Sequence, residues 1–182
     1  MDENALAEAC VEGDYLAQKR LYQLYAPLMM GVCMRYSSDK SDAEDILQDG
    51  FIKVYEKLDT FSGTGALGAW IRRIMVNTAL QRYRANKNLQ LVRLEDSTVH
   101  LQEVSDDALS SMSADELLIK IQRLPVGFRT VFNLYAIEGY KHNEIAEILG
   151  ISVGTSKSQY SRSRALLREM IENENNFGER AI

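Results

Sequence analysis

Residues 142–172 have the sequence HNEIAEILGISVGTSKSQYSRSRALLREMIE, and they decide the fold of the carboxy-terminal part of the chain. Apolar residues recur at helical spacing up to Leu149. Gly150 then stands where a left-handed backbone can end a helix at little cost, and Ser152 can cap the next helix. The stretch therefore predicts a short helix, a tight turn and a longer helix that ends near Glu172.

The second of these helices is basic and rich in hydroxyl groups. Its residues Tyr160, Ser163, Leu167 and Ile171 recur at helical spacing and are expected to face inward. The second helix of a helix-turn-helix unit enters the major groove, where Lys, Arg and Gln side chains contact base edges and phosphates. A helix pair with a purely structural role is the alternative, which this basic surface disfavours. The candidate DNA contacts are Thr155, Lys157, Ser158, Gln159, Ser161 and Arg162.

The charge distribution supports a nucleic-acid partner, although the net charge of the 182-residue chain is −5. Residues 1–60 carry 6 basic and 12 acidic side chains, whereas residues 61–94 carry basic side chains and no acid. Residues 148–168 likewise contain basic and no acidic side chains. Two basic stretches on an acidic chain offer phosphates two places to bind, whereas two solvated charged faces are the alternative interpretation.

Helical periodicity also dominates the rest of the chain. Leu21, Leu24 and Leu28 follow the spacing of an apolar helix face. The first predicted helix ends near Tyr36, and the second runs from a capping box at 41–44 to about Thr60. A third runs from about Leu67 to Asn86. A fourth runs from a capping box at 113–116 to Leu124, and a fifth begins at Pro125.

Between residues 91 and 112 the periodicity fails and the composition is acidic and polar, which predicts a flexible linker. The chain is therefore expected to be all-α, with two small helical domains joined by that linker. The predicted boundaries are 1–90 for the first domain, 91–112 for the linker, 113–175 for the second domain and 176–182 for a tail.

Nothing in the sequence points to catalysis, a metal or a cofactor. Cys10 and Cys33 stand alone and are predicted to be small buried hydrophobic residues. There is no nucleophile–base pair, metal-ligand cluster or phosphate-binding loop. No apolar run has the length of a membrane span, and the acidic start of the chain does not resemble a signal peptide. We therefore expect a cytoplasmic protein without stable membrane insertion.

The segment from Glu144 to Thr155, followed by Lys157, Ser158 and Arg162, resembles region 4.2 of the bacterial sigma-70 family of RNA polymerase sigma factors. It is most similar to the extracytoplasmic-function (ECF) group. The resemblance implies that this part of the chain binds the −35 element of duplex promoter DNA and the flap of the second-largest polymerase subunit. The opening helices of the same region match Leu124, Pro125, Arg129, Val131, Phe132, Glu138 and Gly139.

The first half of the chain resembles region 2 of the same family. Residues 42–55 (DAEDILQDGFIKVY) match region 2.2, and residues 70–79 (WIRRIMVNTA) match regions 2.3 and 2.4. Tyr22, Tyr25 and Pro27 fit region 2.1. The resemblance covers nearly the whole chain, in the order of the ECF group, which joins regions 2 and 4 by a linker.

This resemblance implies two partners for the first domain. The helix of region 2.2 docks on the clamp of the largest subunit of core RNA polymerase, and the matching outward positions are Asp45, Gln48, Asp49 and Tyr55. Regions 2.3 and 2.4 hold the −10 element as it becomes single-stranded. The residues expected to contact it are Arg72, Arg73, Asn77, Gln81, Arg82 and Arg84.

Some positions depart from the family pattern. Ser156 and Tyr160 replace a branched apolar residue and a Leu, and we expect the tyrosine ring to fill the space beside an inward-facing Ser156. Gln159 replaces an Arg, which should change −35 preference more than general affinity. The loop 61–68 matches the segment that captures a flipped −10 base but lacks the frequent Ser-Phe pair, and Trp70 is expected to belong to the core.

The sequence thus predicts an ECF-type sigma factor that is not an enzyme. It would bind core RNA polymerase, bring it to promoters and assist promoter melting, and an anti-sigma factor would hold it inactive. A helix-turn-helix repressor or activator without polymerase affinity is one alternative, and an inactive sigma decoy is another. The basic stretch with Asn77 in the first half disfavours the former, and the presence of both basic stretches disfavours the latter.

Overall fold

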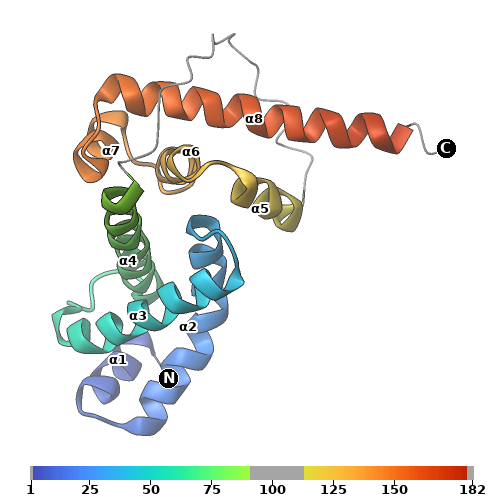
Figure 1. Cartoon of the computed structure of the whole chain (residues 1–182). Coiled ribbons are helices and arrows are strands. Elements are labelled where there is room, and N and C mark those ends of the chain that lie inside the picture. The colour runs from blue at the N-terminus through green and yellow to red at the C-terminus, as the bar shows by residue number, and fades with distance from the viewer. Residues whose placement is uncertain (1, 91–112, 180–182) are drawn as a thin grey trace. The chain divides into compact units, whose positions relative to one another are not determined.

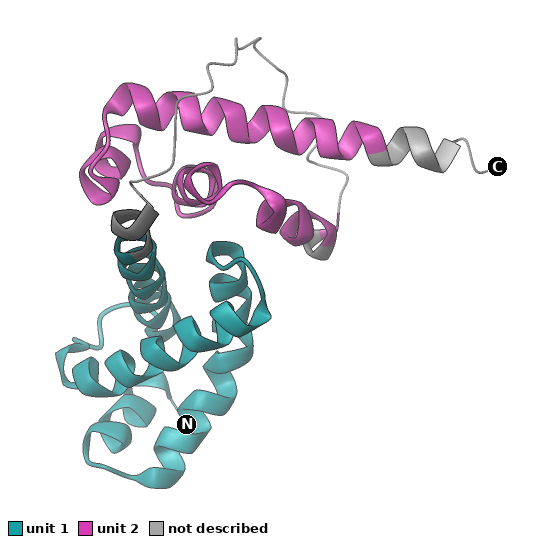
Figure 2. Ribbon diagram, in the orientation of Figure 1, with its two compact units in different colours: residues 1–91 teal, residues 92–182 magenta. Residues whose placement is uncertain are grey.

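The computed structural model describes residues 2–90 and 113–179, and the chain divides into two compact units, residues 1–91 and 92–182 (Figures 1 and 2). Every regular element in the described ranges is a helix, which confirms the predicted all-α class. The predicted linker at 91–112 and residues 180–182 of the predicted tail lie outside the described residues.

Unit 1 is built around the long helix α2, which packs against α1, α3 and α4. The sequence did not predict α1, a short helix at the start of the chain. The elements of this unit are α1 (Glu3–Val11), α2 (Tyr15–Tyr36), α3 (Lys40–Lys57), a 3₁₀ turn (Leu58–Thr60) and α4 (Leu67–Gln90).

The start of α3 differs from the prediction. The side chain of Asp39 accepts a hydrogen bond from the backbone N–H of Asp42 at 2.9 Å, so Asp39 caps the helix. Asp39 already has the extended backbone of a cap residue, and Ser41 consequently lies inside the first turn. The predicted capping box at 41–44 is therefore wrong.

Helix α2 ends at Tyr36, as its apolar spacing predicted. Leu21 is fully buried, but Leu24 and Leu28 are 51% and 64% exposed. Three helices cover α2, and they bury a set of residues that includes Met29 and Cys33. The prediction for the cysteines is confirmed, because both are buried thiols and burial raises the pKa of Cys33 to about 12.

Unit 2 is a second helical body. The predicted capping box at its start is confirmed, because Ser113 Oγ accepts a hydrogen bond from the N–H of Glu116 and Glu116 Oε2 accepts one from the N–H of Ser113. The last helix extends past the predicted end at Glu172. The elements are α5 (Ala114–Arg123), α6 (Val126–Phe132), a π-helical turn (Asn133–Ile137), α7 (His142–Leu149) and α8 (Val153–Glu179).

The core of unit 2 joins α5, α6 and α8. Ile121, Leu124, Phe132 and Leu167 form a buried cluster, against which Tyr160 packs. Ser163, Leu167 and Ile171 are also buried, as the helical spacing of α8 predicted. The inward face of α8 is thus fixed.

Helices α3 and α4 approach each other closely at Gly50. A side chain at Gly50 would overlap with the sulfur of Met75, which is itself fully buried. Gly50 therefore lets the two helices pack closely at this point. A side chain at Gly31, on α2, would by contrast extend into open space.

We expect Gly50→Ala to lower the free energy of unfolding of unit 1 by about 1–3 kcal/mol, because the added methyl group would force the fully buried side chain of Met75 to move. Gly31→Ala is the matched control, and it should raise stability by about 0.5–1 kcal/mol through the better helix propensity of Ala. Urea unfolding followed by the fluorescence of Trp70, the chain's single tryptophan, measures both. Equal effects of the two substitutions would show that the α3–α4 contact is not close.

Candidate nucleic-acid and polymerase interfaces

The helix-turn-helix of unit 2 has the predicted turn. Gly150 adopts the left-handed conformation at the end of α7, with φ of 62°. Ser152 Oγ accepts a hydrogen bond from the N–H of Thr155 at 2.9 Å and so caps α8. Ile145, Ala146 and Leu149 form the buried side of α7. This geometry fixes the amino-terminal end of α8 at the turn.

The six predicted DNA contacts on α8 are not equally accessible. Lys157 is exposed, and the other five are partly exposed. Two of the hydroxyl groups already have local partners, because Thr155 Oγ1 lies 2.8 Å from Ser152 Oγ and Ser158 Oγ donates to the carbonyl of Thr155. Lys157 is consequently the most accessible charge on this part of the helix.

Two of the three departures from the family pattern on α8, Ser156 and Tyr160, belong to one cluster. Ser156 is completely buried, and its hydroxyl lies 2.9 Å from Nδ1 of His142 on α7. The His142 ring stacks on Tyr135 with centroids 4.3 Å apart, and Tyr160 packs on Tyr135 at 4.4 Å. As expected, Ser156 faces inward beside the larger ring, but sequence reasoning missed His142 as the partner of its hydroxyl.

The electrostatic environment favours the neutral form of this histidine. Burial of the ring, followed by the positive charge of Lys157, lowers the pKa of His142. The hydrogen bond and the stacked ring hold the start of α7 against the start of α8. The cluster therefore positions the end of α8 that carries the candidate DNA contacts.

Helix α4 of unit 1 carries an exposed polar stripe, which we define as Arg73, Asn77, Gln81 and Arg84. Successive members are three or four residues apart and so lie on one face of the helix. Arg72 is only partly exposed. Gln81 is held from α3, because its Oε1 accepts a hydrogen bond from Lys53 Nζ at 2.8 Å, and the same Nζ donates to Thr78.

Arg82 is directed toward α3. Its Nε lies 3.0 Å from Asp42, and its terminal nitrogens lie 2.8 Å from Asp45 and 3.8 Å from Asp49. The hydrogen bond to Asp45 and the charges of all three carboxylates raise the pKa of Arg82 further. A predicted DNA contact is thus paired with two residues predicted to bind the polymerase.

Helix α1 holds the segment that precedes α4. Glu3 accepts hydrogen bonds from the backbone N–H of Leu67 and from the hydroxyl of Tyr25, both at 2.8 Å. Both hydrogen bonds lower the pKa of Glu3, and the bond from Leu67 has the larger effect. Burial, followed by the hydrogen bond to Glu3, raises the pKa of Tyr25 to about 12. Glu3 therefore caps the first turn of α4 from a distant part of the sequence.

The loop before α4 is packed as well. The side chain of Asn4 lies beside Gly63, which has a positive φ of 70°. Phe61 packs against Trp70 with ring centroids 5.7 Å apart, and Trp70 is half-buried rather than fully in the core. Helices α1 and α4 thus hold both ends of the loop predicted to capture a base.

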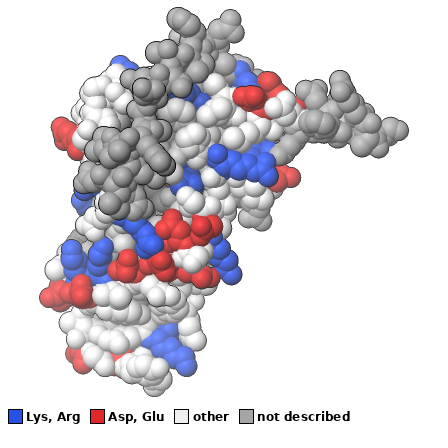
Figure 3. All heavy atoms as spheres, in the orientation of Figure 1, with Lys and Arg blue, Asp and Glu red and all other residues white. Residues whose placement is uncertain are grey.

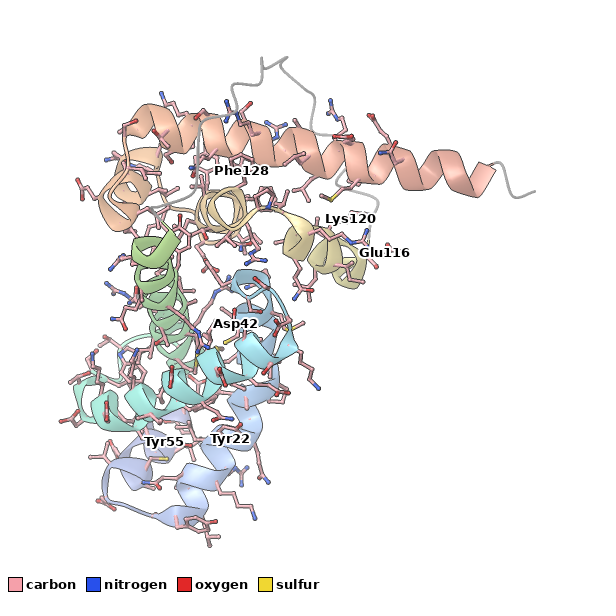
Figure 4. The ribbon with its side chains drawn as sticks, in the orientation of Figure 1. Tyr22, Asp42, Tyr55, Glu116, Lys120 and Phe128 are labelled. Carbon is pink, nitrogen blue, oxygen red and sulfur yellow. The ribbon has the colours of Figure 1, made fainter. Side chains whose placement is uncertain are left out.

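The predicted polymerase surface on α3 is largely exposed. The side chains of Asp45, Gln48 and Asp49 are all exposed to solvent. Tyr55 differs from the outward position predicted for it, because its hydroxyl donates to the carbonyl of Gln18 at 2.9 Å and burial raises its pKa to about 12. Figure 4 labels Tyr22 and Tyr55; each packs against Phe51, with ring centroids 4.7 Å and 6.2 Å apart, so that the aromatic contacts join α2 to α3.

Acidic side chains gather in a band on the face of unit 1 shown in Figure 3, and basic side chains border it. Within the described ranges, no group of His, Cys, Asp and Glu residues is arranged to hold a metal ion. The same part of the chain has no helix that is long and apolar enough to cross a membrane.

Both units of the chain are similar to parts of known proteins. The family model for sigma-70 region 2 matches residues 21–89, and that for sigma-70 region 4 matches residues 114–167. The ECF RNA polymerase sigma-E factor of Haemophilus influenzae is 33% identical, over 95% of each chain. The ECF sigma factor SigW of Bacillus subtilis is 32% identical, over 88% of this chain and 91% of its own.

A solved structure is also similar. It is that of the sigma factor RpoE from Bartonella quintana in complex with the anti-sigma factor NepR, with 25% identity, a TM-score of 0.49, and coverage of 85% of this chain and 96% of that chain. The sequence matches define the class of protein, because both conserved regions of a sigma factor are present in order. The chain belongs to the sigma-70 family, within its ECF group.

The first testable consequence concerns His142. Its pKa is lowered from 6.5 on folding, so the folded state binds fewer protons than the unfolded state just below that pH. The contribution of neutral His142 to the free energy of unfolding of unit 2 should therefore be fully present above pH 6.5. It should be lost as the pH falls through the pKa of His142 in the folded state.

Titration of the His142 ring by NMR, in buffer and in urea, measures this shift. We expect a lower pKa in buffer, and we expect His142→Gln to remove its share of the pH dependence of unfolding. A pKa in buffer equal to or above that in urea would contradict the arrangement described for the cluster.

The second consequence concerns Glu3. Glu3→Ala should leave the N–H of Leu67 without its partner and loosen the first turn of α4, so that this amide exchanges faster with deuterium. Because the pKa of Glu3 is lowered from 4.5, the same bond should be kept above that pH and lost as the pH falls through the folded value. Glu8→Ala on the same helix is the control, and equal exchange in both variants would refute the capping role.

Proposed function

We propose that the two units divide promoter recognition between them while both bind core RNA polymerase. The amino-terminal end of α8 contacts the −35 element, and α4 with its preceding loop contacts the −10 element as it opens. The exposed face of α3 docks on the clamp of the largest polymerase subunit, and unit 2 docks on the flap of the second-largest subunit. The exposed stripe on α4 is the observation that carries this proposal.

The stripe fits a single DNA strand. Arg73 and Arg84 bring positive charge for the backbone, and Asn77 lies between them with an amide that can donate to and accept from a base edge. Gln81 is oriented by Lys53, which leaves its amide nitrogen available for the DNA.

The start of α8 fits duplex DNA. Lys157 is exposed there, and the partial positive charge at the amino-terminal end of the helix favours phosphates. Gln159 and Arg162 are the candidate base contacts in the major groove. The His142–Ser156 pair holds this end of the helix in place for both kinds of contact.

The docking face of α3 combines charge with apolar surface. Asp45 and Asp49 offer carboxylates to a basic partner, and Ile52 on the same helix is 56% exposed. Leu24 and Leu28 on the neighbouring helix α2 are also exposed. Large exposed apolar side chains near a charged surface are typical of a protein-binding site.

Promoter-directed transcription initiation by such a factor needs no chemistry of its own, because the polymerase forms the phosphodiester bonds. We therefore propose a non-catalytic regulator that acts in the bacterial cytoplasm, where the genome is. An anti-sigma factor that covers the same surfaces is the partner expected to keep it inactive.

Co-elution with purified core RNA polymerase, followed by run-off transcription from a library of genomic fragments, tests this function. We expect a stable complex and transcripts from a defined subset of fragments. Failure to co-elute would overturn the sigma role and leave a DNA-binding regulator. Co-elution without any transcript would instead indicate a decoy.

Binding to the −35 element gives a further prediction. Lys157→Ala and Arg162→Ala should each weaken binding of the holoenzyme to a promoter obtained in the run-off experiment by roughly 1–3 kcal/mol, through loss of a base or phosphate contact. Lys19→Ala removes the same charge from an exposed site on α2 and serves as the control. Promoter affinity unchanged by either substitution in α8 would rule out α8 as the recognition helix.

A further inference from the structure

We infer that Arg82 couples polymerase docking to DNA binding: in the free chain its guanidinium is held by Asp42, Asp45 and Asp49, and a basic partner that binds Asp45 and Asp49 releases it for the DNA backbone. The inference rests on the proposed function, which assigns the exposed face of α3 to the polymerase and α4 to the −10 element. It gives Arg82 a role different from that of the neighbouring Arg73.

The contacts are specific and come from both helices. Arg82 lies on α4, and the three aspartates lie on consecutive turns of α3, with nitrogen–oxygen distances of 3.0 Å to Asp42, 2.8 Å to Asp45 and 3.8 Å to Asp49. The planar guanidinium can bind several carboxylates at once through its separate N–H groups. Arg82 is therefore oriented toward the docking helix.

The local charge disfavours DNA in this state. Three carboxylates surround one guanidinium, so the site carries an excess of negative charge. A phosphate that approached Arg82 would be repelled by the aspartates at distances well within the screening length of about 8–10 Å at physiological salt. Removal of Asp45 and Asp49 by a basic partner would leave one carboxylate for one guanidinium.

The pairs are also weak enough to exchange. The side chain of Arg82 is 33% exposed, and those of Asp45 and Asp49 are 56% and 58% exposed. Solvent-exposed ion pairs of this kind stabilise a protein only weakly, so a competing cation on a partner can displace them. By thermodynamic linkage, DNA bound at Arg82 would in turn strengthen polymerase docking by the same factor.

The test uses the full chain without polymerase, so that it does not depend on docking. The probe is a fluorescein-labelled oligo(dT) strand of about 20 nucleotides, followed by fluorescence anisotropy, because backbone and stacking contacts do not need a known promoter. One background is Asp45→Asn/Asp49→Asn, which removes the two carboxylates that the partner would bind. The matched control background, which removes two carboxylates that do not contact Arg82, is Glu44→Gln/Glu56→Gln.

Arg82→Gln is then introduced into the wild-type chain and into both backgrounds. In the wild-type chain and the control background we expect it to lower affinity for the strand by less than about twofold. In the aspartate-to-asparagine background we expect a loss of about fivefold or more, within the usual range of coupled sites. The slope of log affinity against log salt should become steeper by about 0.7 when Arg82 is released, which corresponds to one added phosphate contact.

Arg73→Gln should lower affinity in every background, because Arg73 lies on the exposed stripe. Equal effects of Arg82→Gln in all backgrounds would overturn the coupling, and so would no effect in the aspartate-to-asparagine background. Circular dichroism and Trp70 fluorescence verify that each variant is folded. A failure of the chain to co-elute with polymerase would overturn the proposed function but would not change these binding results.

Discussion

The packing of α3 against α4 is the contact on which the rest of unit 1 depends. Gly50 lets the helices approach at Met75, and the polar contacts of Lys53 and Arg82 lie along the same pair of helices. The contact therefore brings two surfaces with different partners onto neighbouring helices, an acidic face on α3 and a polar, basic stripe on α4. A partner that binds one surface changes the electrostatic field at the other, so docking and strand capture need not be separate events.

In unit 2, a cluster of aromatic and polar side chains fixes the start of the recognition helix. A fully buried hydroxyl such as that of Ser156 needs a hydrogen-bond partner, and His142 provides it from the preceding helix. Tyr135 and Tyr160 fill the space around the imidazole ring. The start of the recognition helix is thus fixed by specific contacts as well as by the turn at Gly150, and such fixation favours contacts that depend on geometry.

Much of the fold could be predicted from the sequence, because its signals are local. The turn at Gly150, the cap at Ser152 and the capping box at 113–116 each depend on residues a few positions apart. The apolar spacing of Leu21, Leu24 and Leu28 predicted the helix but not its buried side, because the burial of α2 depends on three helices that periodicity alone does not place. The bonds of Glu3 to Leu67 and of Arg82 to Asp45 join residues 64 and 37 positions apart, and no local pattern indicates them. The residues of the candidate site came from family resemblance, whereas their pairing came from the structure.

The central claim is that this chain brings core polymerase to a promoter and holds the −10 strand open. Permanganate reactivity of thymines around the −10 element, on a promoter obtained by run-off transcription, measures this directly. We predict reactive thymines when the chain and core polymerase are both present, and none with either protein alone. A complex that protects the promoter from nuclease but leaves its thymines unreactive would contradict the claim, as would reactivity with core polymerase alone.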